Sequence, residues 1–511
     1  MRWLIQQFAQ LLQPAAQRFE RALDQPDLAQ QQIQQQICQR LTASRYGQFL
    51  GINSIADWQR VPIVTYDDIQ PWIRPDQLGK ASLLTPEPIL FYEQTSGSQG
   101  PAKWIPYTGS LRRSFNQMFC VWAYDLIRQG PVFSTGKLYF CITPRFQGST
   151  ASTRPGLNDD SEYLDEWLRL LLSPFLVSPA GLHAGLSPQE FKHRLCIALL
   201  QAERLEIISI WSPSFLKILL DYILTHRVTL SQQVKLSPVR RRLLTDPDLE
   251  LAWPQLWPHL KLISCWDNLY AADQAQGLRQ RFPGVLVQGK GLLATEAPMT
   301  IPLIAGQGTL PVLDQVFFEF EDEQGQIHRL HELTTGHTYQ IILSQLGGLY
   351  RYRIGDRVRV SRFYRQTPCL EFLGRSRATS DLVGEKLHES FVQQVLQKLH
   401  LGACFSLLLP VVEPARYLLL LDRTDPAADP DSLASRLDQA LGASPHYRQA
   451  RHLGQLHPPQ VFIAADWTER WLQFRLRAGQ RWGDQKLAVL AQPITQADWQ
   501  RLAGPDWRPD A

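Results

Sequence analysis

The middle of this 511-residue chain alternates between two hydrophobic patterns, and this alternation limits the folds open to it. Short apolar runs that suit strands are separated by longer segments in which apolar residues recur at helical spacing. Strands that alternate with helices are typical of an α/β sandwich, so we expect that architecture for a large N-terminal domain. The strand-like runs are 137–142 and 205–210, and the helix-like segments are 111–128, 161–176, 188–203 and 213–225.

The C-terminal half of the chain changes pattern twice. Residues 310–375 hold β-rich segments between turn signals such as Gly325 and Gly336, which predicts a largely antiparallel subdomain. A polar, turn-like stretch at 376–384 follows, and helix and strand patterns then restart. We therefore expect an N-terminal domain over 1–378 and a small, mobile α+β domain over 379–511.

Composition excludes several classes of protein. The 52 Lys and Arg residues nearly balance the 48 Asp and Glu residues, so the net charge of +4 does not favour nucleic acid or a membrane surface as partner. Seven widely spaced cysteines exclude a disulfide framework and a CxxC zinc site, and suit a reducing compartment. No apolar run reaches about 18 residues, and glutamines interrupt the N-terminal segment. We expect a cytoplasmic monomer.

The first 45 residues read as helix and are rich in glutamine. Glutamine is a good helix former and is mostly exposed in proteins. The glutamine run at 30–36 therefore predicts a solvated helix face.

A Ser/Gly-rich loop with a lysine follows the apolar run 89–91. Its glycines let the backbone approach an anion, while hydroxyls, N–H groups and a lysine can bind phosphate oxygens. The loop lacks the Gly-Lys-Ser/Thr end of a P-loop and the glycine spacing of a nucleophile elbow, and such a sequence by itself is more often an ordinary turn. Its candidate residues are Thr95, Ser96, Gly97, Ser98, Gly100 and Lys103.

A strand-like segment at 350–360 places one acid on an apolar face. Read with a period of two, Asp356 lies among Tyr, Ile and Val, because the arginines occupy the opposite face. A buried carboxylate is costly unless it is paired, and a ribose diol could donate two hydrogen bonds to it. A structural ion pair, or a turn at Gly355, is the alternative, and a nucleic-acid surface is a third. The arginines are Arg351, Arg353, Arg357 and Arg359.

Two shorter motifs also suit nucleotide chemistry. Thr295 and Glu296 follow the apolar run 285–287, and a hydroxyl beside a carboxylate can hold a phosphate oxygen and Mg²⁺. Lys486 stands on a turn that Gly483 begins. Each of these two motifs is common in proteins, so neither indicates a nucleotide site by itself.

The order of these motifs resembles that of the adenylate-forming enzymes. More closely, the chain resembles the GH3 family of acyl-acid amido synthetases, which has plant and bacterial members, and it looks like the bacterial type. The resemblance covers nearly the whole chain. The matching segments are 61–66, 95–108, 295–296, 348–356, 370–375, 384–386, 447 and 453–456.

The resemblance implies a ligase that uses ATP and Mg²⁺ to adenylate a carboxylic acid and then transfers the acyl group to the amine of an amino acid. The loop hydroxyls would hold the ATP phosphates beside Lys103, and Thr295 would contact the α-phosphate. Glu296 would bind the metal. The other implied roles are the ribose site for Asp356, the hinge near the nucleotide for Arg375, and C-terminal lysines for Lys386 and Lys486, of which Lys486 would neutralise charge as pyrophosphate leaves.

Two alternatives to amide synthesis stay open. The acyl-adenylate could pass to a thiol such as coenzyme A, or the chain could be a degenerate relative that binds a nucleotide or acid without turnover. The acid pocket should lie between residues about 110 and 350, where Arg145, Trp211 and Phe215 are candidates.

Overall fold

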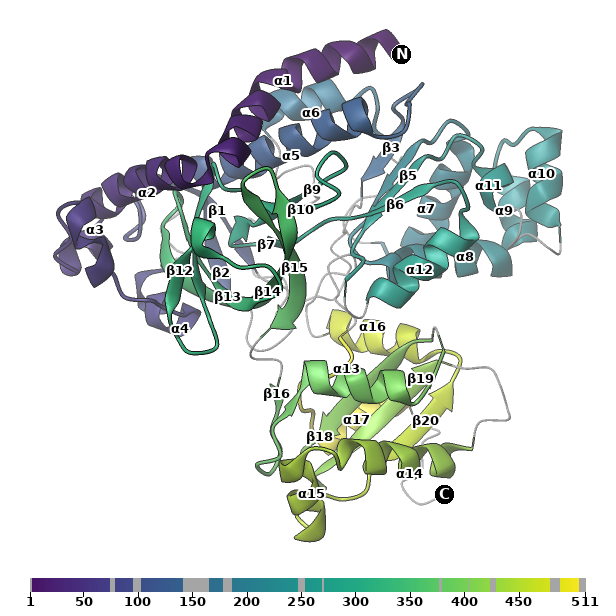
Figure 1. Ribbon diagram of the computed structural model, residues 1–511. Coiled ribbons are helices and arrows are strands. Elements are labelled where there is room, and N and C mark those ends of the chain that lie inside the picture. The colour runs from purple at the N-terminus through teal and green to yellow at the C-terminus, as the bar shows by residue number, and fades with distance from the viewer. Residues whose placement is uncertain are drawn as a thin grey trace.

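The computed structural model in Figure 1 has an α/β fold with a C-terminal domain, which confirms the predicted class. The N-terminal elements form the larger part of the molecule, and the elements after residue 378 lie together at one side of it. The structure describes residues 2–73, 79–94, 103–140, 165–177, 186–246, 253–268, 271–375, 379–402, 404–422, 429–477 and 488–504.

Long helices open the chain and cover one side of the larger part (Figure 1). In α1 (Arg2–Asp24), apolar residues recur every three or four positions, so the helix has one buried face. It packs on α5 (Gly109–Gln129), whose start is capped by the Thr108 hydroxyl, which accepts the Leu111 N–H at 3.3 Å. The other helices here are α2 (Pro26–Ala43), α3 (Arg45–Phe49) and α4 (Tyr66–Ile69).

The predicted solvated glutamine face of α2 is wrong at two positions. Gln30 and Gln34 are buried, with only 5% and 8% of their surface exposed. The Gln30 amide donates to the carbonyls of Leu313 and Val316, at 2.7 and 2.8 Å, and accepts the Phe318 N–H at 2.8 Å. This glutamine therefore joins α2 to the edge of a distant strand.

A four-stranded parallel sheet in the order β3-β4-β5-β6 is the α/β centre. Its short strands are apolar and mostly buried, as expected for a sheet covered by helices. The strands are β3 (Leu138–Phe140), β4 (Ile207–Ser209), β5 (Leu262–Cys265) and β6 (Leu286–Gly289), and the helices around them are α6 (Glu166–Leu172), α7 (Pro188–Gln201), α8 (Pro213–Thr225), α9 (Arg227–Gln233), α10 (Pro238–Thr245), α11 (Trp253–Leu256) and α12 (Ala272–Arg281).

The antiparallel sheet predicted for 310–375 is also present, in the order β12-β11-β13-β14-β15. Three small hairpins accompany it. The five strands are β11 (Val316–Glu321), β12 (Ile327–Arg329), β13 (Thr338–Gln345), β14 (Leu349–Tyr364) and β15 (Thr367–Arg375), and the hairpins are β1 (Ile89–Gln94) with β2 (Trp104–Thr108), β7 (Leu293–Ala294) with β8 (Ala297–Pro298), and β9 (Thr300–Leu303) with β10 (Gly308–Pro311).

Many of the C-terminal elements share a hydrophobic core made of residues between 382 and 490, whereas Trp467, Trp471 and Trp499 belong to a cluster that also contains N-terminal helices. That core supports the division at 378/379, which stays a prediction. The elements are β16 (Thr379–Ser380), β17 (Leu387–His388), α13 (Glu389–Lys398), β18 (Ser406–Val411), β19 (Arg416–Asp422), α14 (Pro430–Leu441), α15 (Pro445–His452), β20 (Gln460–Ala464), α16 (Trp467–Arg477) and α17 (Gln496–Ala503).

Two further expectations concern the described residues only. None of their helices is long and apolar enough to cross a bilayer. The six cysteines among them are free.

Candidate active site

The predicted Thr-Glu pair forms the turn of the β7–β8 hairpin. Ala294 pairs with Ala297, so Thr295 and Glu296 are the two residues that reverse the chain. Glu296 is buried, with 4% of its surface exposed. The Tyr107 hydroxyl of β2 donates to the Thr295 carbonyl at 2.9 Å, which ties this turn to the β1–β2 hairpin.

The β1–β2 hairpin brings both ends of the Ser/Gly loop to the same place. Gln94 and Trp104 are paired across the hairpin, so the residues between them return to their starting point. Lys103 comes directly before β2, and its Nζ lies 5.4 Å from the centre of the Tyr66 ring and 3.4 Å from the Tyr352 hydroxyl. The base of the loop is therefore beside β14.

Tyr352 connects the loop lysine to the buried acid. Its hydroxyl lies 3.4 Å from Lys103 Nζ and 3.5 Å from Glu296 Oε1. Backbone hydrogen bonds hold the segment around Val64 against β14. The Val64 N–H donates to the Arg351 carbonyl, and the Arg353 N–H donates to the Val64 carbonyl. Lys103 and Glu296 thus meet at one phenol, and Val64 is bonded to the backbone on either side of it.

Tyr66 and Tyr107 keep their protons at neutral pH. Burial raises the pKa of Tyr107 well above its ordinary value, and the carboxylates of Glu93 and Glu296 raise it further. Burial also raises the pKa of Tyr66, whose hydroxyl oxygen accepts the Trp104 N–H at 2.8 Å. These two phenols therefore act as neutral hydrogen-bonding groups near Glu296.

Asp356 is buried on β14, as its place on the apolar face predicted, with 1% of its surface exposed. In the ladder between β13 and β14, Ile342 pairs with Arg353 and Gln340 pairs with Arg357, so four residues of β14 lie opposite two of β13. This bulge contains Gly355, whose φ is +90°. Asp356 stands four residues beyond Tyr352, about 13 Å at full extension. Across the sheet its backbone is paired with that of Arg375.

Arg351, which the strand pattern places on the polar face, is buried. Its guanidinium is buried and forms two bonds to the Glu319 carboxylate, at 2.9 and 3.1 Å, and one to the Val61 carbonyl at 2.8 Å. These three bonds offset much of the cost of burying this charge. The strict alternation starts only after the bulge.

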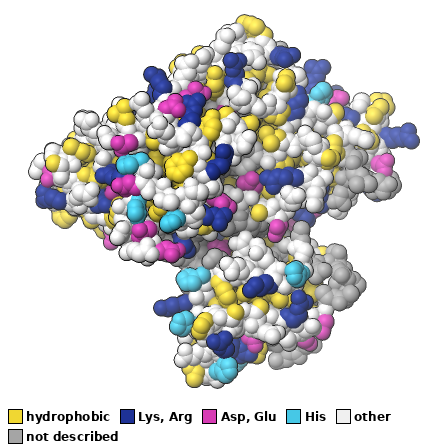
Figure 2. All heavy atoms as spheres, in the orientation of Figure 1, with side chains coloured by type: hydrophobic (Ala, Val, Ile, Leu, Met, Phe, Trp, Pro, Cys, Tyr) yellow, Lys and Arg dark blue, Asp and Glu magenta, His cyan; other side chains and the backbone are white. Residues whose placement is uncertain are grey.

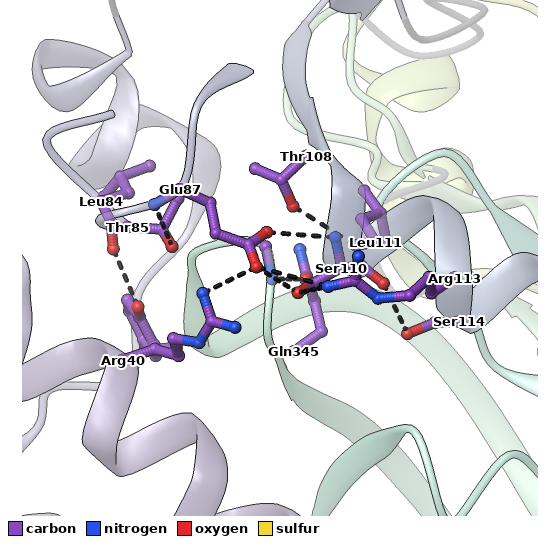
Figure 3. A network of polar contacts seen from close by, with 12 residues as sticks. Arg40, Leu84, Thr85, Glu87, Thr108, Ser110, Leu111, Arg113, Ser114 and Gln345 are labelled. Carbon is purple, nitrogen blue, oxygen red and sulfur yellow. Dashed lines mark hydrogen bonds and ion pairs between the residues drawn. The ribbon is translucent and has the colours of Figure 1, made fainter. Parts of the chain in front are cut away.

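Figure 3 shows a polar network that positions the start of the β1–β2 hairpin. Glu87 accepts hydrogen bonds from the N–H and hydroxyl of Ser110, at 3.1 and 2.5 Å, and pairs with Arg40 at 2.7 Å. Burial alone would raise the pKa of Glu87, but these hydrogen bonds and the Arg40 charge outweigh it and lower the pKa. The carboxylate also lies at the positive end of α5.

The predicted site residues thus fall into three groups. Lys103, Thr295 and Glu296 come together around Tyr352, and Asp356 follows on the same strand. Lys386 is exposed between β16 and β17 with φ +46°, in the C-terminal domain. Outside the described residues lie Thr95, Ser96, Gly97, Ser98, Gly100 and Lys486.

The sequence reasoning assigned no role to Tyr66, Tyr107 and Tyr352, which frame the site. Each belongs to a segment that matched the family pattern, and that was the available signal. A tyrosine in a strand is most often core, so its position alone did not distinguish it.

The donor set fits a Mg²⁺ ion that is held largely by phosphates. Among the described residues, no group of three or more His, Cys, Asp or Glu side chains could form a protein cage for a metal. Glu296 offers a single buried carboxylate, and Mg²⁺ commonly takes one or two carboxylates together with phosphate oxygens and water.

Comparison with known families identifies the chain. The GH3 family N-terminal domain matches residues 15–253, the GH3 family central domain matches 309–375, and the GH3 family C-terminal domain matches 386–493. The chain belongs to the GH3 family. The matched ranges contain both the β1–β2 hairpin and the β14 strand of this GH3 protein.

Its relatives include plant enzymes. Indole-3-acetic acid-amido synthetase GH3.3 of Arabidopsis thaliana is 23% identical, with 83% of this chain and 82% of the relative covered. Jasmonoyl--L-amino acid synthetase JAR6 of Nicotiana attenuata is also 23% identical, with 72% of each chain covered. The structure of the GH3.15 acyl acid amido synthetase in complex with 2,4-DB superposes with a TM-score of 0.80 at 18% identity over 96% of both chains, which shows the same fold.

Proposed function

We propose that this GH3 protein is an ATP-dependent acyl acid amido synthetase, a ligase that joins a carboxylic acid to an amino acid through an acyl-adenylate. The observation that supports this most directly is the meeting of Lys103 and Glu296 at Tyr352, at the base of the Ser/Gly loop. Three family models along the chain agree with it.

In the first step a carboxylate oxygen of the acid attacks the α-phosphorus of ATP, and pyrophosphate leaves. Lys103 supplies positive charge beside the phosphates that the loop hydroxyls and the Thr295 hydroxyl hold. Mg²⁺ bound at Glu296 would neutralise phosphate charge. Asp356 binds the ribose hydroxyls, so the chain contributes positioning and electrostatic stabilisation.

In the second step the amine nitrogen of an amino acid attacks the acyl carbon. The new C–N bond replaces the bond to AMP, which leaves, and the amine loses a proton. Closure of the domain over 379–511, with Lys486 and Lys386 on it and Arg375 at the hinge, would keep water from the adenylate.

We place this reaction in a cytoplasmic monomer. The free cysteines among the described residues suit a reducing compartment. On the face shown in Figure 2, basic and acidic side chains are interspersed, so this face presents no large patch of one charge for a nucleic acid.

A matrix of carboxylic acids and amino acids, assayed for AMP release and by mass spectrometry, tests the proposal. We expect AMP and an amide for at least one pair, and loss of ATP affinity with a retained fold in Asp356→Asn. Thioester formation with coenzyme A would favour the acyl-CoA ligase alternative. Nucleotide binding without AMP release from any mixture would favour a degenerate binding protein.

A further inference from the structure

The turn between β16 and β17 is held together by a buried carboxylate. The two strands are paired as a hairpin, so residues 381–386 form the connecting turn. Glu385 lies within this turn and is fully buried. Its two carboxylate oxygens accept the Leu382 N–H and the Val383 N–H, each at 2.8 Å. The side chain of Glu385 therefore folds back and fixes the first half of its own turn.

The same carboxylate is joined to the core of the C-terminal domain. The hydroxyl of Tyr417 in β19 donates to Glu385 and lies 2.8 Å from the Ser380 hydroxyl. Tyr417 is itself fully buried. Burial raises the pKa of Tyr417, and the hydrogen bond to Glu385 raises it further, so the phenol stays a neutral donor. The turn is thereby fixed relative to β19.

The turn ends in an unfavourable backbone conformation at Lys386. The φ of this lysine is +46°, in the left-handed region that residues with a Cβ rarely adopt. Two residues earlier, the Gly384 N–H donates to the Asp381 carboxylate at 2.7 Å. Such conformations persist where surrounding contacts impose them, and they are frequent at ligand sites. Glu385 makes contacts of this kind directly before Lys386.

Lys386 stands between this turn and the strand that reaches the proposed ribose site. Its side chain is exposed, and it is the only basic residue in the turn sequence DLVGEK. Helix α13 begins three residues later and contacts β15. β15 ends at Arg375, whose backbone is paired with that of Asp356. In Figure 1, α13 lies on the side of the C-terminal domain that is turned toward the larger part of the molecule.

A second acid of the same domain has similar partners but holds no such turn. Asp438 of α14 accepts the Tyr447 hydroxyl at 2.7 Å and pairs with Arg451 at 2.9 Å, which joins α14 to α15. Both helices lie on the side away from the larger part of the molecule (Figure 1). Asp438 therefore fixes one helix to another, whereas Glu385 fixes a turn that ends in a lysine.

We propose that Glu385 is a positioning residue, which holds the turn over 381–386 so that Lys386 can bind a phosphate of the nucleotide. The nucleotide as the ligand of Lys386 rests on the proposed function. Glu385 is buried and acts through the lysine. A lysine on a preformed turn loses less conformational freedom when it binds an anion, so the fixed turn raises the affinity for phosphate.

Calorimetry with ATP, AMP and adenosine, in the presence of Mg²⁺, tests this role. We expect Lys386→Met to bind ATP and AMP at least about fivefold more weakly, with adenosine affinity unchanged because adenosine has no phosphate. Glu385→Gln should show the same pattern, since an amide offers one acceptor oxygen where the carboxylate offers two. The double variant should lose no more than Lys386→Met alone, because Glu385 acts through the lysine.

Two further variants complete the experiment. Tyr417→Phe removes one of the hydrogen bonds to Glu385 and is milder, so it serves where Glu385→Gln does not fold. It should lower ATP and AMP affinity at least about twofold, with adenosine affinity unchanged. Asp438→Asn, the matched control, should keep the affinity for all three ligands, although it lowers stability.

Four results with the variants would overturn the inference. They are unchanged ATP and AMP affinity in Lys386→Met, unchanged affinity in folded Glu385→Gln or Tyr417→Phe, a further loss in the double variant, and an equal loss in Asp438→Asn. A wild-type protein that binds neither nucleotide would overturn both this inference and the proposed function. Phosphate affinity that depends on Glu385 and Lys386, without AMP release from any mixture of acid and amino acid, would reject the synthetase and retain the positioning role.

Discussion

Whether a polar side chain of this protein is buried depends on its hydrogen-bond and ion-pair partners. Gln30 belongs to a run that reads as solvated surface, yet three hydrogen bonds bury it against β11. Arg351 stands on the polar face of a strand pattern, yet Glu319 and a carbonyl bury it. In both cases the partner is far away in sequence, so the local pattern does not contain it.

We expect Gln30→Leu to lower the free energy of unfolding by about 2–4 kcal/mol, because it leaves buried backbone groups without hydrogen bonds. Gln31 is the matched control, since it is exposed and its side-chain amide donates to the Asp27 carboxylate at 2.9 Å. Gln31→Leu should change stability by less than about 0.5 kcal/mol. Urea denaturation measures both, and equal effects would contradict the argument.

The buried ion pair between Arg351 and Glu319 leads to a second prediction for single residues. Arg351→Met should destabilise by about 3–5 kcal/mol, because it leaves a buried carboxylate without its cation. Adding Glu319→Leu should restore part of that loss, so the double variant should be less destabilised than the sum of the single variants. Strictly additive effects in urea denaturation would show that the two charges do not stabilise each other.

At the scale of elements, one carboxylate ties the amino ends of three parallel strands. Glu206 precedes β4, accepts N–H groups from Ser134 and Gly136 before β3, and pairs with Lys261 before β5. Burial alone would raise its pKa, but the bonds from Ser134, Lys261 and Gly136 outweigh burial and lower the pKa to about 2. Short strands of three or four residues need such a connection, since their own ladders are brief.

This carboxylate predicts an acid dependence of stability. A pKa lowered from 4.5 to about 2 stabilises the fold fully above about pH 4.5, and the contribution of about 3 kcal/mol disappears as the pH falls toward 2. Glu206→Gln should therefore be less stable than the wild type at pH 7, with the difference shrinking in acid. Denaturation at several pH values checks this, and a difference independent of pH would contradict it.

At the scale of the whole molecule, the two domains share more than a linker. Lys192 of α7 is buried, and its Nζ lies 3.1 Å from the half-exposed Glu469 carboxylate of α16, which also accepts from the Gln189 amide at 3.2 Å. Trp471 of α16 belongs to the same hydrophobic cluster as Leu195 of α7. These contacts hold the arrangement in Figure 1, whereas the predicted mobility of the domain requires that they separate.

We expect Glu469→Gln to shift the balance toward separated domains, because it removes the ion pair with Lys192. An ion pair with one exposed partner contributes up to about 1 kcal/mol, a shift of about fivefold at most. Small-angle X-ray scattering should show a larger radius of gyration. Asp466→Asn is the control, since Asp466 stands directly before α16 and pairs with Arg470 of that helix, and an equal expansion there would exclude a specific role for Glu469.

Local properties of the sequence were enough to predict the α/β class, the antiparallel sheet after residue 310, the burial of Asp356 and the family. Hydrophobic period, turn residues and motif order are all contained in short stretches of chain, so they can be read without the fold. The nucleotide-binding roles of the loop at 95–100 and of Lys486 remain predictions.

Only the tertiary structure decided which residues meet. It placed Lys103 and Glu296 on Tyr352, joined α2 to β11 through Gln30, and set Lys290 beside Ser209 at the edge of the sheet. Each of these contacts joins segments tens to hundreds of residues apart. Which side chains meet depends on the space and charge that a distant segment provides, and a local sequence pattern contains no information about that segment.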